Sequence, residues 1–172
     1  MLKSISVLVA TTLIPGLELR ASIPVGFFAS DIRGSLGIWG VVAICLVANI
    51  LLGVAVFSLM SLAENILRRW RWFDDNIWPR LEKRQEKLRP LIEKYGVWGV
   101  AVFIGVPLPG TGAYTGAMGA YLLKLDKKRF WLANALGVTI AAIAVTAICL
   151  FIDNGVVAED SFVRRLFLKN VG

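Results

Sequence analysis

Two apolar stretches decide the class of this protein: IWGVVAICLVANILLGVAVFSLM at residues 38–60 and FWLANALGVTIAAIAVTAICLFI at residues 130–152. Each stretch has 23 residues and no charged side chain. At a rise of ~1.5 Å per residue, a helix of that length reaches ~34 Å and crosses the ~30 Å hydrocarbon core of a bilayer. The chain is also 57% hydrophobic with a mean hydropathy of +0.69, more apolar than an ordinary soluble domain. We therefore expect an integral membrane protein.

Two shorter apolar runs, residues 5–14 and 97–106, are each followed by helix-breaking residues. As helices they would reach only ~15 Å, which is too short to cross the bilayer. The expected breaks are Pro15, Gly16 and Pro24 in the first half, and Pro107, Pro109 and Gly110 in the second. Broken backbone at membrane depth is tolerated only where protein covers it or water fills a cavity. Each run therefore predicts one arm of a re-entrant hairpin. A cleaved signal peptide is the alternative for residues 5–14, but no small-x-small cleavage site follows.

The two halves of the chain repeat the same order of elements. An offset of 94 residues places Pro15-Gly16 on Pro109-Gly110 and brings each short run, break, second arm and long span into register. We expect a single transmembrane domain. Its parts are repeat one at 1–60, an amphipathic linker at 61–95, repeat two at 96–154 and a short tail at 155–172.

The distribution of Lys and Arg predicts the orientation of these repeats. Residues 68–94 hold nine basic residues, and residues 124–129 hold four more. The positive-inside rule makes residues 61–95 and 124–129 cytoplasmic in a multi-pass protein of the cell membrane. The first span then runs inward and the last runs outward, so the halves are inverted copies. Inverted repeats with interrupted helices place a binding site near the midplane at the repeat interface.

Glu18 and Arg20 are ionisable residues among side chains apolar enough to lie in lipid. Charges at that depth are expensive and mark a candidate functional site. One interpretation is a structural ion pair. In the other interpretation Arg20 binds the anionic head group of a substrate, bidentately if it is a phosphate, and Glu18 is a proton carrier. Whether the two residues pair or act separately stays open.

The second hairpin has no charge and offers hydroxyls at Thr111, Tyr114 and Thr115 as further substrate contacts. Backbone amides near a helix N-terminus could also hold an anion there. For the small residues Gly112, Gly116 and Ala120, close helix packing is the favoured interpretation. Asn49 and Asn134 lie in the spans, and we expect them to form hydrogen bonds between helices.

Several function classes are not indicated. The chain has no histidine, and Cys45 and Cys149 each lie inside an apolar span, so no metal site, disulfide framework or activated nucleophile is expected. No cofactor motif is present, and we do not expect an enzyme. The net charge of +7 does not indicate nucleic acid, because in a membrane protein the basic residues report orientation.

The motifs ELRASIP at 18–24 and GVPLPGTGAYTGAMGA at 105–120, in this order of elements, resemble the small multi-drug export family. That family is similar to the broader DedA/VTT superfamily of membrane proteins. The resemblance implies two opposed re-entrant hairpins and movement of polyprenyl phosphates or phospholipids between leaflets, often coupled to protons. DedA proteins typically carry an Arg just after the second Pro-Gly, whereas this chain has Thr111-Gly112-Ala113. In this chain Arg20, which lies in the first hairpin, would have to play the role of that arginine.

We therefore expect a small all-α membrane transporter of a lipid with an anionic head group. One alternative is an exporter of amphipathic cations, with Glu18 as the binding group. Another is a non-transporting scaffold that uses the basic amphipathic linker to bind membrane lipid. Two spans enclose little volume, so a homodimer is an arrangement that the sequence allows.

Overall fold

The computed structural model describes residues 1–67, 94–107 and 111–154. These residues form six helices and no strand, which confirms the all-α class. The helices are α1 (Leu2–Leu13), α2 (Glu18–Phe28), α3 (Ser30–Leu67), an unlabelled helix at Lys94–Gly105, α6 (Ala113–Leu122) and α7 (Lys127–Asp153). Within them, Ser30–Glu64 and Lys127–Asp153 are long and apolar enough to cross a membrane. Most of the predicted linker, the tail, Pro109 and Gly110 lie outside the described residues.

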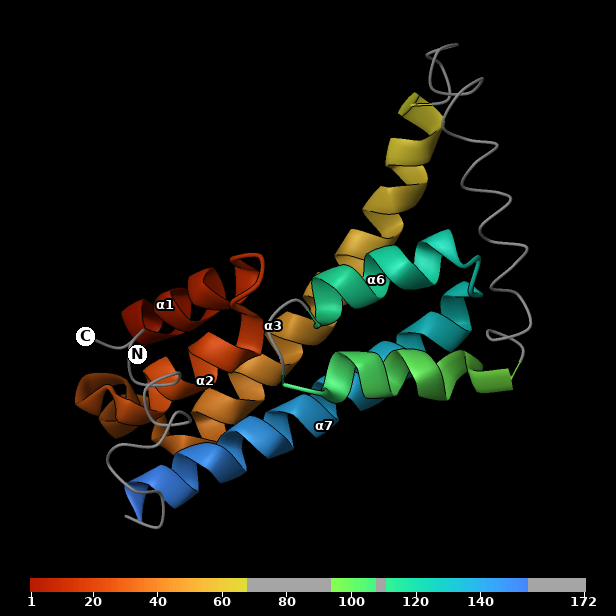
Figure 1. Cartoon of the computed structure of the whole chain (residues 1–172). Coiled ribbons are helices and arrows are strands. Elements are labelled where there is room, and N and C mark those ends of the chain that lie inside the picture. The colour runs from red at the N-terminus through yellow and green to blue at the C-terminus, as the bar shows by residue number, and fades with distance from the viewer. Residues whose placement is uncertain (68–93, 108–110, 155–172) are drawn as a thin grey trace.

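Among the described residues, each half of the chain has two short helices followed by a long one (Figure 1). The turn between α1 and α2 holds Pro15 and Gly16, and the second break separates the end of Lys94–Gly105 from the start of α6. The predicted order of short arm, break, second arm and span is therefore present. The long helix α3 has one kink, at Gly37, where φ is 68° and ψ is 164°. That backbone conformation suits glycine, and it sets the start of the straight apolar helix at the predicted residue, Ile38.

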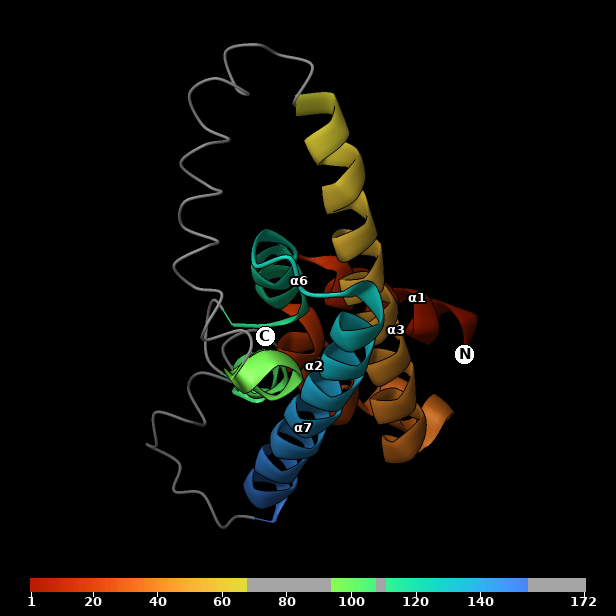
Figure 2. The same cartoon turned by 90° about the vertical axis from the view of Figure 1, so that its right-hand side faces the viewer.

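The two long helices pack side by side and run in opposite directions (Figures 1 and 2). Near the start of α3, Arg33 forms an ion pair of 3.2 Å with Asp153 at the end of α7. Toward the other end, the ring of Phe57 on α3 stacks on that of Phe130, in the first turn of α7, with centroids 4.3 Å apart. The amide of Asn134 also donates to the carbonyl of Ile50 at 3.0 Å, which confirms the expected bond between helices.

The prediction that Pro24 breaks the first hairpin is wrong. Pro24 lies inside α2 and is buried. A proline within a helix removes one backbone hydrogen bond and usually kinks or ends it. Helices in membranes tolerate this where packed neighbours support the freed backbone. Here α2 contacts α1, α3 and α7, so the helix continues to Phe28.

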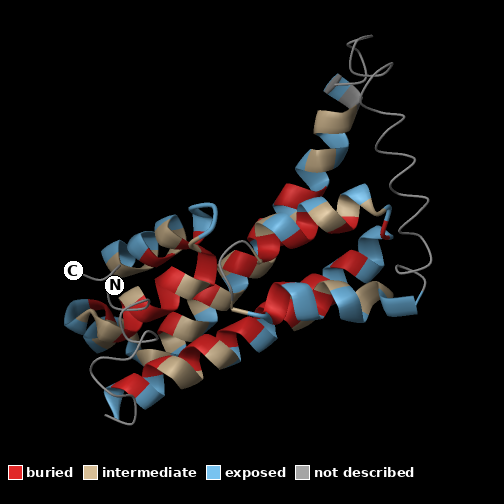
Figure 3. Cartoon of the chain, viewed as in Figure 1, coloured by how far each residue is buried: buried red, intermediate tan, exposed pale blue. Residues whose placement is uncertain are grey.

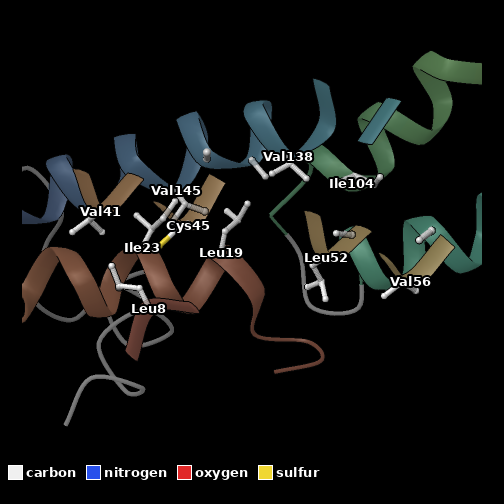
Figure 4. Close-up of a cluster of buried hydrophobic side chains, with 14 of the residues drawn as sticks. Leu8, Leu19, Ile23, Val41, Cys45, Leu52, Val56, Ile104, Val138 and Val145 are labelled. Atoms are coloured by element: carbon white, nitrogen blue, oxygen red, sulfur yellow. The ribbon is translucent and has the colours of Figure 1, made fainter. Parts of the chain in front are cut away.

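The core lies where α2 meets the two long helices (Figure 3). Ile23 of α2, Cys45 of α3 and Val145 of α7 gather in one buried cluster (Figure 4). Close packing between the short helices depends on small residues, because a Cβ added to Gly116 would collide with Ile104. Ala120 is buried on the same helix, so the packing interpretation holds for both small residues.

Candidate functional site

The tips of the two hairpins meet beside Asn49, which is halfway between Ile38 and Met60 on α3. The side-chain amide of Asn49 donates to the carboxylate of Glu18 at 3.5 Å. The hydroxyl of Tyr114, in the first turn of α6, donates to the carbonyl of Leu13 at 2.7 Å, where α1 ends. The turn of the first hairpin and the break of the second are thus in direct contact at mid-length of a predicted span.

Glu18 holds the start of α6. Its side chain is 3% exposed, and its carboxylate accepts the backbone N–H of Ala113 at 2.8 Å and of Tyr114 at 3.2 Å. The first amides of a helix have no partner within the helix, and the helix dipole favours a negative charge there. The N-cap residue, Gly112, has no side chain to provide one. Glu18 therefore caps a helix in the other half of the chain.

Arg20 binds the end of the helix that precedes α6 in the chain, Lys94–Gly105. Its Nη2 donates to the carbonyl of Val106 at 2.8 Å and to that of Ile104 at 3.3 Å. The same nitrogen donates to Oγ1 of Thr111 at 3.0 Å, and Nη1 donates to the carbonyl of Thr111. The last carbonyls of a helix lack partners, and the dipole there favours a cation. Arg20 therefore caps the C-terminal end of the helix Lys94–Gly105.

The two charges act on the two helix ends that meet at the break of the second hairpin, Arg20 at the end of Lys94–Gly105 and Glu18 at the start of α6. Sequence alone left open whether Glu18 and Arg20 pair with each other, and in the structure the hydrogen bonds of both go mainly to the second hairpin. Glu18 also has a left-handed backbone, with φ of 49°. Such a conformation costs a non-glycine residue about 1–3 kcal/mol and persists where the surroundings require it. Here it begins α2 with the carboxylate directed to α6.

Gly112 provides the space for both charged groups. A Cβ at this position would lie 2.5 Å from Oε2 of Glu18 and 2.7 Å from Nη1 of Arg20. Its φ of 157° and ψ of −170° also belong to a region that is open essentially to glycine alone. The packing interpretation of Gly112 was therefore incomplete, because its neighbours are a carboxylate and a guanidinium. Asn49 is a second residue of this site, and the sequence predicts for it only a hydrogen bond between helices. The signal in the sequence is a polar residue in the middle of an apolar span.

The three predicted hydroxyls have different positions. Thr111 lies at the guanidinium of Arg20, and its own hydroxyl is 2.7 Å from the carbonyl of Val106. Tyr114 joins the hairpin tips, as described above. Thr115 is exposed, its hydroxyl is 3.4 Å from the carbonyl of Gly112, and it lines an apolar groove outside the site. The structure thus brings Thr111 and Tyr114 to the charged pair and leaves Thr115 apart from it.

Two polar atoms of this site are buried without a hydrogen-bond partner among the described residues: Nε of Arg20 and Oδ1 of Asn49. Buried polar groups are normally paired, so each of these atoms needs an explanation. No group of three or more metal-ligating side chains occurs within residues 1–67, 94–107 and 111–154. The arrangement offers hydrogen bonds and charge inside an apolar helical domain.

Two helices long and apolar enough to cross a membrane, with a buried charged contact beside Asn49, indicate a membrane protein. The chain belongs to the family described as "Putative small multi-drug export protein", whose family model matches residues 18–144. The match begins at Glu18 and includes the whole second hairpin. The family description places the chain among membrane export proteins. No curated protein and no solved structure matches the chain.

Proposed function

We propose that this chain is a multi-pass transporter of the cell membrane that moves a lipid with an anionic head group between leaflets. The head group would be the phosphate of a polyprenyl phosphate or of a phospholipid. The observation that carries the proposal is Arg20, a cation at the contact between the hairpins whose buried Nε has no partner among the described residues. The Nε edge of a guanidinium, together with an Nη, matches the geometry of a phosphate.

The arrangement of the hairpins supports an alternating-access transporter. The hairpin tips meet beside Asn49, and the long helices α3 and α7 are antiparallel. Both features support the proposal of two re-entrant hairpins in inverted repeats. In such transporters the ends of discontinuous helices hold the charges of substrate and coupling ion. In this chain the guanidinium of Arg20 and the carboxylate of Glu18 occupy those ends, an arrangement expected of a closed state in the proposed transporter.

The same contacts suggest how the site opens. Protonation of Glu18 would remove the negative charge that caps α6 and weaken its bonds to the amides of Ala113 and Tyr114. A substrate phosphate would then bind Arg20 and loosen the guanidinium from the carbonyls of Val106 and Thr111. DedA proteins carry an Arg just after the second Pro-Gly. Arg20 contacts Thr111, the residue at that place in this chain. The proposal includes no cofactor and no chemical change in the substrate.

Export of amphipathic cations is the second candidate, and the family description favours it. The buried carboxylate of Glu18 would be the binding group, and a cationic substrate would compete with the amides of α6. Arg20 would oppose such a substrate, because like charges repel in a low dielectric. The scaffold alternative depends on the linker, most of which lies outside the described residues.

A transport assay separates these candidates. Purified protein in liposomes should move a fluorescent anionic phospholipid or polyprenyl phosphate between leaflets faster than empty liposomes do. Arg20→Lys keeps the charge but loses the bidentate edge, so movement should fall at least tenfold. The control Arg33→Gln alters an exposed arginine and should leave the rate unchanged. Glu18→Gln should remove the dependence of the rate on pH.

Three results would contradict the proposal. Lipid movement unchanged in Arg20→Lys would exclude Arg20 as the head-group ligand. Efflux of a cationic dye that is lost in Glu18→Gln, without lipid movement, would establish the exporter instead. Neither activity, together with lipid binding by the linker, would favour the scaffold.

The inverted arrangement has its own test. Single cysteines at Ser35 and Lys128, in a chain lacking Cys45 and Cys149, should react with impermeant reagents from opposite sides of the membrane. Ser35 follows the start of α3, and Lys128 lies in the first turn of α7, at the opposite end of the antiparallel pair. Labelling of both positions from one side would rule out the inverted repeats.

A further inference from the structure

The turn between α6 and α7 has an unusual residue at its tightest point. The amide of Leu125 donates to the carbonyl of Ala120 at 2.9 Å, and the amide of Lys124 donates to that of Tyr121 at 2.9 Å. This pair of bonds is the Schellman motif, whose left-handed position is normally glycine. Here the position is Lys124, with φ of 55°. A lysine in this conformation is strained.

A cavity of about 250 Å³ lies beside this turn. Lys124, Lys127, Glu64 and the ring of Tyr121 line it. The hydroxyl of Tyr121 donates to the carboxylate of Glu64, so that carboxylate already has a partner within the cavity wall. Two lysines and one such carboxylate leave the cavity with a net positive charge.

The start of α7 adds to this positive charge. Lys127, Lys128 and Arg129 are its first three residues, and they outnumber the carboxylate of the N-cap residue Asp126, which accepts the amide of Lys128 at 3.0 Å. Cations at a helix N-terminus are unfavourable, because they lie at the positive end of the dipole. A bound anion in the cavity would relieve this repulsion. The Nζ of Lys127 also lies 5.3 Å from the ring centre of Trp131, and tryptophan is typical of the membrane interface.

An apolar groove of about 450 Å³ meets the cavity at Leu125, which lines both. The groove runs between the helix Lys94–Gly105 and α6, and its lining includes Gly96, Gly99, Gly116 and Gly119. Glycines leave it open, and none of the described residues that line it is charged. A positively charged cavity that adjoins an apolar groove matches the two parts of a phospholipid.

We propose that the α6–α7 turn is a binding site for an anionic phospholipid. The phosphate lies in the cavity between Lys124 and Lys127, and an acyl chain lies in the groove beside Leu125. Basic pockets between membrane helices bind anionic head groups in this way. The site is separate from Glu18 and Arg20 and does not depend on the proposed transport. The competing explanation is that these lysines only set the orientation of the chain, in which case neighbouring lysines are equivalent.

The test compares lysines that line the cavity with one that does not. The full-length chain in a neutral detergent is titrated with phosphatidylglycerol, and the thermal midpoint and the lipid retained in native mass spectra are measured. Phosphatidylglycerol should raise the midpoint, and phosphatidylcholine should not. Lys124→Gly suits the Schellman turn, so without lipid it should be at least as stable as the native chain. With phosphatidylglycerol, Lys124→Gly and Lys127→Gln should lose at least two thirds of the rise.

Lys128→Gln is the matched control, because Lys128 has the same charge in the same turn and does not line the cavity. It should keep the full effect of phosphatidylglycerol. An equal loss in Lys128→Gln would indicate general surface charge and overturn the proposal. A full effect in both cavity variants would also overturn it. If inorganic phosphate alone produced the same rise, the site would be one for a free anion.

Discussion

The two hairpins occupy equivalent places in the two halves of the chain but contribute different chemistry. The first has a short turn whose own backbone closes it, with the amides of Leu17 and Glu18 donating to the carbonyl of Ile14 at 3.1 and 3.3 Å. The second has a longer break, and no charged residue occurs between Tyr95 and Leu123. Its helix ends are satisfied by Glu18 and Arg20 from the first hairpin. The first hairpin therefore provides the charged side chains. The second provides helix ends whose backbone groups have no partner within the helix and bind those side chains.

The largest expected effect comes from removing the carboxylate between the hairpins. Glu18→Ala should lower the free energy of unfolding by about 3 kcal/mol, because the buried amide of Ala113 and the partly buried amide of Tyr114 lose their acceptor. Glu18→Gln keeps one acceptor oxygen and should cost about half as much. The measurement is unfolding of the purified chain in mixed micelles. Asp31→Ala, at an exposed carboxylate, is the control, and equal stability of Glu18→Ala and Asp31→Ala would refute the capping role.

The next effect tests the space that the second hairpin leaves for the charges of the first. Gly112→Ala should destabilise the chain by about 2 kcal/mol, since its Cβ would press on Glu18 and Arg20 and its backbone conformation suits glycine. Gly119→Ala, in the middle of α6, has nothing within 4 Å of the new Cβ. It should stabilise the helix by up to about 1 kcal/mol. Similar unfolding curves for both variants would mean that no charged group lies against Gly112.

The smallest effect concerns charges outside the hairpin contact. Arg33 and Asp153 pair at 3.2 Å, but their side chains are 39% and 38% exposed. Exposed pairs contribute about 0–1 kcal/mol and are screened by salt. Arg33→Gln should therefore change the unfolding free energy by less than about 0.5 kcal/mol, and less still at high salt. A loss as large as that of Glu18→Ala would remove the contrast between deep and surface charges.

The sequence was sufficient to predict the long helices and both breaks. The length of the apolar runs sets the helices, and proline and glycine mark the breaks. Even the kink at Gly37 falls at the expected start of the first span. The continuation of α2 through Pro24 depends on packing against three other helices, which local sequence rules do not include. The capping of α6 by Glu18 joins residues 95 positions apart, so no local pattern indicates it. Gly112 matched a packing motif, and only the three-dimensional contact identifies its charged neighbours.

The capping of α6 by a carboxylate from the first hairpin is the central claim, and tyrosine amides report on it directly. The chain has three tyrosines, so ¹⁵N-tyrosine labelling gives three backbone signals that single substitutions assign. The amide of Tyr114 donates to Glu18, whereas Tyr95 and Tyr121 lie in other parts of the second half. In Glu18→Gln the charge-assisted bond becomes a neutral one, which is weaker. The Tyr114 amide proton should then move upfield and exchange faster with solvent, while the other two signals stay in place. A Tyr114 signal that does not move, or three signals that move together, would contradict the account.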